Sequence, residues 1–502
     1  MTLDDSSWPS TKLLFSAMVI SLGGSGNYCF QMILTNPAQQ AFLNFVNGSY
    51  YQKNERYLEL TELETMWSPI VSILYWGTIL GSLLIEKSIS KFGRKHALTM
   101  ANCGQAFGIA LGIMAYFLND FILYAISRFF LGIFQAISLG VGPMYILECS
   151  PAKCRGVIST STALAGQLGI IVSAILAMPV IWGNVNDWWK LYVAELIFTI
   201  ALIFVSLFFP ESPVVLQNEE KILAAERSIK FYHGVTRDEA KHLLNTDKGH
   251  PQDGQQRAIG LFEIFANPIS RWGTLVGGCV MFAHVFSGIT VVQSFAVDIL
   301  MNTGLSMFAA TSANVFINTM PLFGIFLSSY MVEKLGRRPL ELFGILALIL
   351  VNTAVVALLY GYDTTKNMIL GWSLVVVVAI FAVTACTTVV PLSFFLPAEL
   401  VAPNVRPQAM TWFNLMMATG RSLLLAIFLP MKLFFGAAIT YGILFIPTMI
   451  LAFFILYSQL PETKGRTFEE TISNRKTRAN YTTRASTYHK YCNSTPLPRT
   501  VA

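Results

Sequence analysis

The sequence KFGRKH at residues 91–96 separates two long apolar runs, at about 66–85 and 98–117. A related sequence, VEKLGRR at residues 332–338, separates two further apolar runs in the second half of the chain. Each run has about the 20 residues that a helix needs to cross a bilayer. Short basic loops between such runs are typical of the inner side of a membrane. The two stretches therefore predict a membrane protein built from two similar halves.

The composition also indicates a polytopic membrane protein. Of the 502 residues, 54% are hydrophobic and only 12% are charged, and the mean hydropathy is +0.56. Soluble domains carry about 25% charged residues, so these values exclude an ordinary soluble enzyme and a disordered chain. The scattered cysteines indicate neither a disulfide framework nor a zinc site.

The apolar runs predict an all-α membrane protein with twelve transmembrane helices in two six-helix repeats. In order, spans 1 to 12 are expected at about 13–34, 66–85, 98–117, 121–147, 157–181, 191–209, 272–297, 306–332, 339–360, 369–398, 408–430 and 434–458. The expected domains are an N-terminal bundle at 1–210, a linker at 211–270, a C-terminal bundle at 271–460 and a tail at 461–502. In the linker, EEKILAAERSIKFYH and TRDEAKHLL have the helical period of amphipathic helices.

The distribution of Lys and Arg predicts the orientation of the spans. The basic loops contain Lys87, Lys91, Arg94 and Lys95 after span 2, Lys153 and Arg155 after span 4, Lys334, Arg337 and Arg338 after span 8, and Arg406 after span 10. The loops after spans 3 and 7 contain neither residue type. We therefore expect a plasma-membrane protein whose termini and linker are cytoplasmic. Asn47, in an Asn-Gly-Ser sequon, then lies outside and is a candidate glycosylation site.

Charged motifs recur between the halves at nearly constant spacing. Gly93-Arg94-Lys95 recurs as Gly336-Arg337-Arg338, Glu148 with Arg155 recurs as Glu399 with Arg406, and Pro210-Glu211-Ser212 recurs as Pro461-Glu462-Thr463. Such a repeat predicts two similarly oriented bundles that rock around a central site. The candidate gating ion-pair residues are Arg94, Glu148, Arg155, Glu211, Glu333, Arg337, Glu399, Arg406 and Glu462. The alternative is that these charges only set the topology.

At these motifs the sequence resembles the facilitative sugar transporters of the major facilitator superfamily, the glucose-transporter type. The matching stretches are KFGRKH (91–96), SRFFLG (127–132), PMYILECSPAKCRG (143–156), PESP (210–213), SGIT (287–290), VEKLGRR (332–338), PAELVAPNVRP (397–407) and PETKGRTFEE (461–470). The resemblance implies the major facilitator fold, with a central sugar site between the two bundles.

The sugar-binding positions depart from the family pattern. In the family, amides of helix 7 hold sugar hydroxyls, but here His284 and Val285 replace two glutamines and Thr290 replaces an asparagine. Phe394 stands where the family has a tryptophan in helix 10. Each hydroxyl left without its amide costs about 1–3 kcal/mol. The candidate binding residues are Gln167, His284, Thr290, Gln293, Asn318, Phe394 and Asn414.

Two arginines fall within predicted spans. Arg421 lies in the apolar run MMATGRSLLL, where its charge costs at least about 2.5 kcal/mol unless it faces a cavity or a partner. Arg128 begins span 4, and in proton-coupled relatives a carboxylate of helix 1 pairs with such an arginine. Span 1, LLFSAMVISLGGSGNYCFQMIL, contains no Asp or Glu. This absence predicts a facilitative uniporter.

Three functions agree with these features. The first is facilitative transport of a hexose or related polyol, and the second is transport of an organic anion on the same fold, suggested by His284 and Arg421. The third is a solute sensor that uses the polar tail for signalling. The expected partners are a small-molecule substrate and the lipid bilayer, with no nucleic acid. No cofactor, metal or enzyme motif is expected, and the absence of a Walker motif argues against ATP-driven transport.

Overall fold

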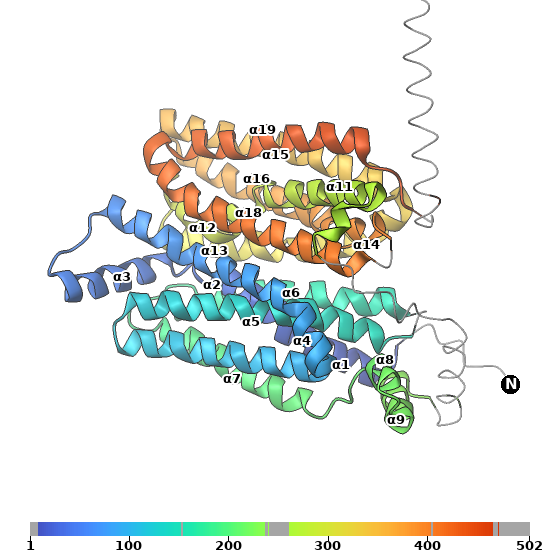
Figure 1. Ribbon diagram of the computed structural model, residues 1–502. Helices are drawn as coiled ribbons and strands as arrows, with labels where there is room; N and C mark the ends of the chain where they lie inside the picture. Colours follow the sequence, from blue (N-terminus) through green and yellow to red (C-terminus); the bar gives the residue numbers. More distant parts are fainter. Residues whose placement is uncertain are drawn as a thin grey trace, which may run out of the picture.

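Two bundles of long helices lie side by side in the computed structural model, one coloured blue to green and the other yellow-green to red (Figure 1). The structure describes residues 9–151, 154–235, 239, 261–402, 405–464 and 470. All regular elements within these residues are helices. The predicted all-α architecture of two six-helix repeats is therefore confirmed.

The N-terminal bundle contains spans 1 to 6. Its helices are α1 (Thr11–Ser21), the π-helical turn η1 (Leu22–Gly26), α2 (Asn27–Leu34), α3 (Gln39–Asn54), α4 (Leu60–Phe117), α5 (Phe121–Glu148), α6 (Arg155–Leu176) and α7 (Trp189–Ser206). Spans 2 and 3 both belong to α4, which changes direction at Gly93. The helix α3 was not predicted, because its sequence QQAFLNFVNGSYYQKN has no clear apolar stripe.

The C-terminal bundle contains spans 7 to 12. Span 7 consists of α11 (Pro268–Val285) and α12 (Ile289–Met301), and span 8 of α13 (Met307–Thr319) and α14 (Pro321–Leu335). Span 9 is α15 (Arg337–Thr365), and span 10 consists of α16 (Met368–Thr387) and α17 (Val389–Glu399). Spans 11 and 12 are α18 (Arg406–Phe435) and α19 (Ala437–Gln459). In the described residues, ten segments are long and apolar enough to cross a membrane. The kinked α4 supplies two spans and the shorter apolar stretch Thr160–Leu176 another, which agrees with twelve.

The linker begins with two short helices, α8 (Pro213–Asn218) and α9 (Ile222–His233), which lie against one end of the N-terminal bundle (Figure 1). The Tyr145 and Tyr232 hydroxyls both donate to the carbonyl of Pro210 and hold this segment there. We call this the α8 end of the molecule and the opposite one the α3 end. The helix predicted for EEKILAAERSIKFYH is confirmed by α9, although it begins only at Ile222. Nearly all of TRDEAKHLL lies outside the described residues.

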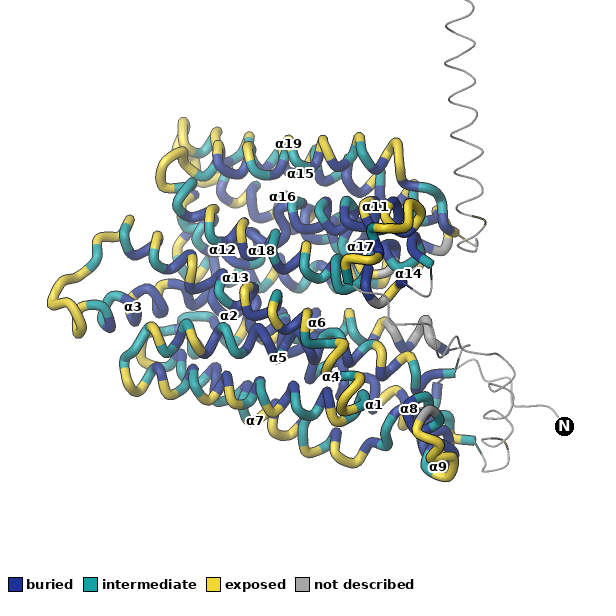
Figure 2. Tube along the Cα trace, in the orientation of Figure 1, coloured by how far each residue is buried: buried dark blue, intermediate teal, exposed yellow. Residues whose placement is uncertain are grey.

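The outer faces of the bundles are apolar. Figure 2 shows exposed residues along the outward sides of α7, α15 and α19, and these include Phe204, Leu350 and Phe454. Contiguous apolar surface of this kind needs a lipid or protein environment. Together with the spans, it identifies a multi-pass membrane protein.

Spans 1 and 7 are both interrupted. Span 1 passes through the π-helical turn η1, and span 7 breaks at Gly288, which has a φ of 98°. A second irregularity occurs at Phe295, with a φ of −137°. Irregular backbone within a membrane is tolerated only where protein or water satisfies its polar groups. In span 7, protein groups fill this role: the Asn352 side chain donates to the Ser287 carbonyl beside Gly288 at 2.9 Å, and Asn36 of the N-terminal bundle donates to the Gln293 carbonyl near the Phe295 kink at 2.9 Å.

Candidate functional site

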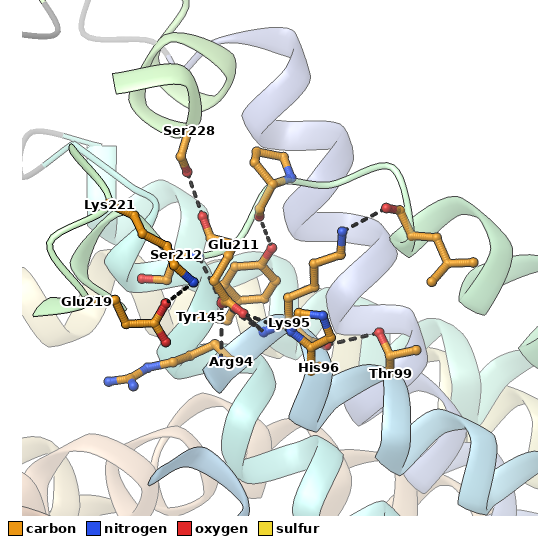
Figure 3. A network of polar contacts seen from close by, with 12 residues as sticks. Arg94, Lys95, His96, Thr99, Tyr145, Glu211, Ser212, Glu219, Lys221 and Ser228 are labelled. Atoms are coloured by element: carbon orange, nitrogen blue, oxygen red, sulfur yellow. Dashed lines mark hydrogen bonds and ion pairs between the residues drawn. The ribbon is translucent and has the colours of Figure 1, made fainter. Parts of the chain in front are cut away.

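At the α8 end, Glu211 and Glu462 bind the start of a helix in each bundle. The Glu211 carboxylate accepts hydrogen bonds from the backbone N–H groups of Arg94, at 3.2 Å, and Lys95, at 2.9 Å (Figure 3). Glu462 accepts equivalent bonds from Arg337 and Arg338, at 3.0 and 3.1 Å. The first N–H groups of a helix lack internal partners. Both glutamates, expected in ion pairs, thus bind the backbone where spans 3 and 9 begin.

Two glycines make these contacts possible. Gly93 and Gly336 have φ values of +76° and +94°, and a Cβ at either position would lie 2.9 Å from an oxygen of Glu211 or Glu462. A side chain would therefore disturb both the backbone and the bound carboxylate. This explains physically why the Gly-Arg motif and the distant Pro-Glu motif recur together.

Replacement of Gly93 or Gly336 by alanine is expected to destabilise the protein. The backbone conformation of both residues, with positive φ and ψ near 180°, alone costs an L-residue about 1–3 kcal/mol, and contact with the glutamate adds to this. Thermal unfolding of the purified protein in detergent measures the loss. Gly442→Ala is the matched control, because its Cβ would meet Val356 at an ordinary 3.5 Å. Equal melting temperatures for all three variants would contradict this explanation.

The predicted arginine–glutamate pairs form within each bundle. Arg94 Nη2 lies 2.8 Å from Glu148, and Arg337 Nη2 lies 3.6 Å from Glu399. Because each pair joins helices of one bundle, it can move with that bundle as a rigid unit. Their gating role stays a prediction.

The other expected gating residues are placed less fully. Arg406 is exposed, whereas the side chains of Arg155 and Glu333 lie outside the described part of the chain.

Toward the α3 end, the side chain of Asn36 joins the two bundles. Its Nδ2 donates to the Gln293 carbonyl at 2.9 Å and to Asn314 Oδ1 at 3.2 Å, and its Oδ1 accepts from Val297 N–H at 3.0 Å. In an unbroken helix, Val297 N–H would bond to the Gln293 carbonyl. Near the kink at Phe295, the Asn36 amide binds both of these groups. Sequence reasoning missed this residue, which only precedes a proline at the end of span 1.

Two predicted binding residues, Gln167 and Asn318, also meet between the bundles. Gln167 Nε2 donates to the Asn318 carbonyl at 2.5 Å, and the Asn318 amide donates to Asn314 Oδ1 at 2.9 Å. In α12, the Thr290 hydroxyl and the Gln293 Oε1 atom are enclosed without a hydrogen-bond partner. These amides and unpartnered atoms are groups that can bind sugar hydroxyls.

His284 and Arg421 lie in direct contact. Arg421 Nη2 lies 3.0 Å from His284 Nε2, and His284 Nδ1 lies 2.7 Å from the Ser393 hydroxyl. Arg421 Nη1 donates to the Tyr28 hydroxyl at 3.0 Å. The cluster therefore connects spans 7, 10 and 11 with span 1 of the other bundle. The sequence singled out both His284 and Arg421 but not their pairing.

Phe394 and Asn414 lie at the margin of this region. The Phe394 ring packs edge-on against His284, with centroids 5.7 Å apart, but 45% of the residue is exposed. Asn414 is half-buried on α18. Nearby Trp412 instead faces the linker, where its indole N–H donates to the Leu261 carbonyl at 2.8 Å.

A buried carboxylate lies close to Arg128, contrary to the expectation drawn from span 1. Arg128 Nη1 donates to the Gln31 side-chain oxygen at 3.1 Å, and the Gln31 amide nitrogen donates to Glu195. Glu195 belongs to α7, so it enters from span 6 rather than span 1. Sequence reasoning missed it because it sought a carboxylate only in span 1. The premise that no such carboxylate is available was wrong.

The glycosylation candidate Asn47 lies within α3. Its Oδ1 accepts from the backbone N–H of Leu58 at 2.9 Å, and the sequon hydroxyl of Ser49 accepts from Phe121 N–H at 3.0 Å. Both side chains therefore help to hold α3 on the bundle. Modification of Asn47 stays a prediction.

Comparison with known proteins agrees with this architecture. The family model described as "Sugar (and other) transporter" matches residues 17–473. The chain belongs to this family. The facilitated glucose transporter member 1 of Gallus gallus is 28% identical over 469 residues, covering 92% of this chain and 93% of the relative. Member 3 of Ovis aries is 26% identical, covering 92% of each protein.

Solved structures of a xylose transporter share the fold. The inward-open xylose transporter XylE from E. coli superimposes with a TM-score of 0.73 at 20% identity, covering 92% of this chain and 99% of that one. Its partially occluded form gives 0.71 at 19% identity. The predicted major facilitator fold is therefore confirmed, and the protein is a membrane transporter of the sugar transporter family rather than an enzyme.

Proposed function

We propose that the protein is an alternating-access transporter that moves a hexose or a related polyol down its gradient. The observation that carries this proposal is the set of amides between the bundles, contributed by both halves: Asn36 and Gln167 from one, and Asn314 and Asn318 from the other. Amide groups donate and accept, as recognition of a polyol requires. Family membership and the named relatives support a sugar as the substrate.

We propose facilitative uniport as the mode of transport. The support is the way in which Arg128 and Glu195 are bonded, not the absence of a carboxylate from span 1. Arg128 bonds to the neutral amide of Gln31, and Glu195 bonds to the same amide. Protonation of Glu195 therefore breaks no direct bond to the guanidinium. The loss of one carboxylate charge does not by itself free Arg128 to move.

Sugar uptake into liposomes containing the purified protein should follow the sugar gradient. An imposed pH gradient should leave the uptake rate unchanged. The Glu195→Gln variant should transport at the wild-type rate, because the glutamine side chain has the shape of glutamate and its oxygen can still accept the hydrogen bond from the Gln31 amide. Uphill accumulation on an inward proton gradient, abolished by Glu195→Gln, would instead establish symport. A panel of labelled hexoses, polyols and organic acids identifies the substrate in the same assay.

We further propose that the α8 end faces the cytoplasm of a plasma-membrane protein, with N-terminal and C-terminal six-helix domains at 1–210 and 271–460. The basic loops after spans 2 and 8 support this orientation. Asn47 and α3 then face outside. The sensor alternative depends on the tail at 461–502, most of which lies outside the described residues.

A further inference from the structure

Arg421 is a buried cation without a carboxylate partner in the described part of the chain. Only 5% of the residue is exposed. Its bonds go to the Tyr28 hydroxyl at 3.0 Å, His284 Nε2 at 3.0 Å and, more weakly, Met32 sulfur at 3.8 Å. Its Nε has no partner. Of the five N–H donors of a guanidinium, Nε and one Nη2 hydrogen therefore stay free.

His284 does not neutralise this charge. A guanidinium can only donate hydrogen bonds, so His284 Nε2 must accept from Arg421, and the ring proton resides on Nδ1, facing Ser393. The imidazole is therefore neutral. The other titratable groups acting on Arg421 include the phenols of Tyr28 and Tyr75, which are ordinarily uncharged at neutral pH.

Two other enclosed cations in the described spans have a carboxylate nearby, one in direct contact and one through an amide. Lys432 lies 2.5 Å from Asp298, and Arg128 shares the Gln31 amide with Glu195. Burial of an isolated charge is unfavourable unless it is paired. Arg421 thus differs from these two cations in lacking a carboxylate, and it lies against the residue that stands at a sugar-binding position of the family.

We propose that the central site takes a sugar that bears a carboxylate, such as a hexuronic or aldonic acid, and that Arg421 binds this carboxylate. This inference rests on the proposed function, because the amides between the bundles bind the hydroxyls of the same molecule. An arginine can offer a carboxylate a fork of N–H groups, and the Nε group of Arg421 has no other partner. Because Nη1 meanwhile holds Tyr28 of the N-terminal bundle, the bound anion is linked to both bundles through one side chain.

Labelled glucuronate and glucose compared in liposomes containing the full-length protein test the proposal. Wild type should take up glucuronate with a kcat/KM at least tenfold above that for glucose. Arg421→Gln should lower glucuronate uptake by roughly 10- to 100-fold and change glucose uptake much less. Lys432→Gln is the matched control in the same helix, and it should affect both sugars equally.

Membrane potential supplies a second readout that needs no variant. Glucuronate carries one negative charge at neutral pH, so its uniport is electrogenic, and each 60 mV or so of inside-positive potential should raise its accumulation tenfold. Glucose should not respond.

The outcomes separate the inference from the proposed function. Glucose uptake without glucuronate uptake overturns the sugar-acid assignment but agrees with sugar transport. Glucuronate uptake that Arg421→Gln does not change overturns the role of Arg421 and also agrees with transport. Uptake of neither sugar nor any other polyol counts against the proposed function itself.

Discussion

Asn36→Leu is expected to shift the protein at least tenfold toward a conformation whose α3 end is open. When the bundles meet at this end, Asn36 bonds to the Gln293 carbonyl and to Val297 N–H, on either side of the Phe295 kink in span 7. Leucine removes both bonds from the closed form, at about 1–3 kcal/mol each. In the open form, water can bond to these groups instead. The substitution therefore destabilises the closed form selectively, and about 1.4 kcal/mol already corresponds to a tenfold shift.

Thiol labelling measures this shift. Ser68 of α4 is buried between the bundles and donates to the Leu425 carbonyl of α18 at 2.5 Å. Ser68→Cys should react slowly with a maleimide in the wild-type background and faster when Asn36→Leu is added. The exposed native Cys103 is replaced beforehand. Asn36→Asp, which can still accept from Val297 N–H, should give a smaller increase. Unchanged labelling in a folded double variant would show that Asn36 does not hold this end closed.

His284→Ala should raise the KM for the transported sugar by roughly 5- to 150-fold, equivalent to about 1–3 kcal/mol. Alanine removes the hydrogen-bonding ring and leaves Arg421 Nη2 and the Ser393 hydroxyl without this partner. His284→Gln restores the amide of the family and should move selectivity toward neutral hexoses. Initial rates across a panel of sugars measure both effects.

A control separates binding from packing at His284. Ser393→Ala removes only the group that holds His284 Nδ1, so it should raise the KM less than His284→Ala does. A histidine that merely packs the helices would give a different pattern: less folded protein in both His284 variants, with the KM and the order of substrates unchanged.

The sequence by itself determined the number of spans, the two-bundle repeat and the family. These features depend on local properties, namely the length of apolar runs and the spacing of charged motifs, which are fixed along the chain. The helix α9 was predictable for the same reason. The helix α3 was not, because mixed polar and apolar residues without an apolar stripe carry no comparable local signal.

Tertiary structure alone decided which polar groups meet. His284 and Arg421 are 137 residues apart, yet their side chains lie 3.0 Å from each other. Glu195 reaches Arg128 through Gln31 of span 1, and Asn36 binds the broken backbone of span 7 from the opposite bundle. Hydropathy identifies each span without its rotation or its neighbours. Those are set by the packing of whole bundles, so the partners of a buried polar residue appear only when the helices are placed against one another.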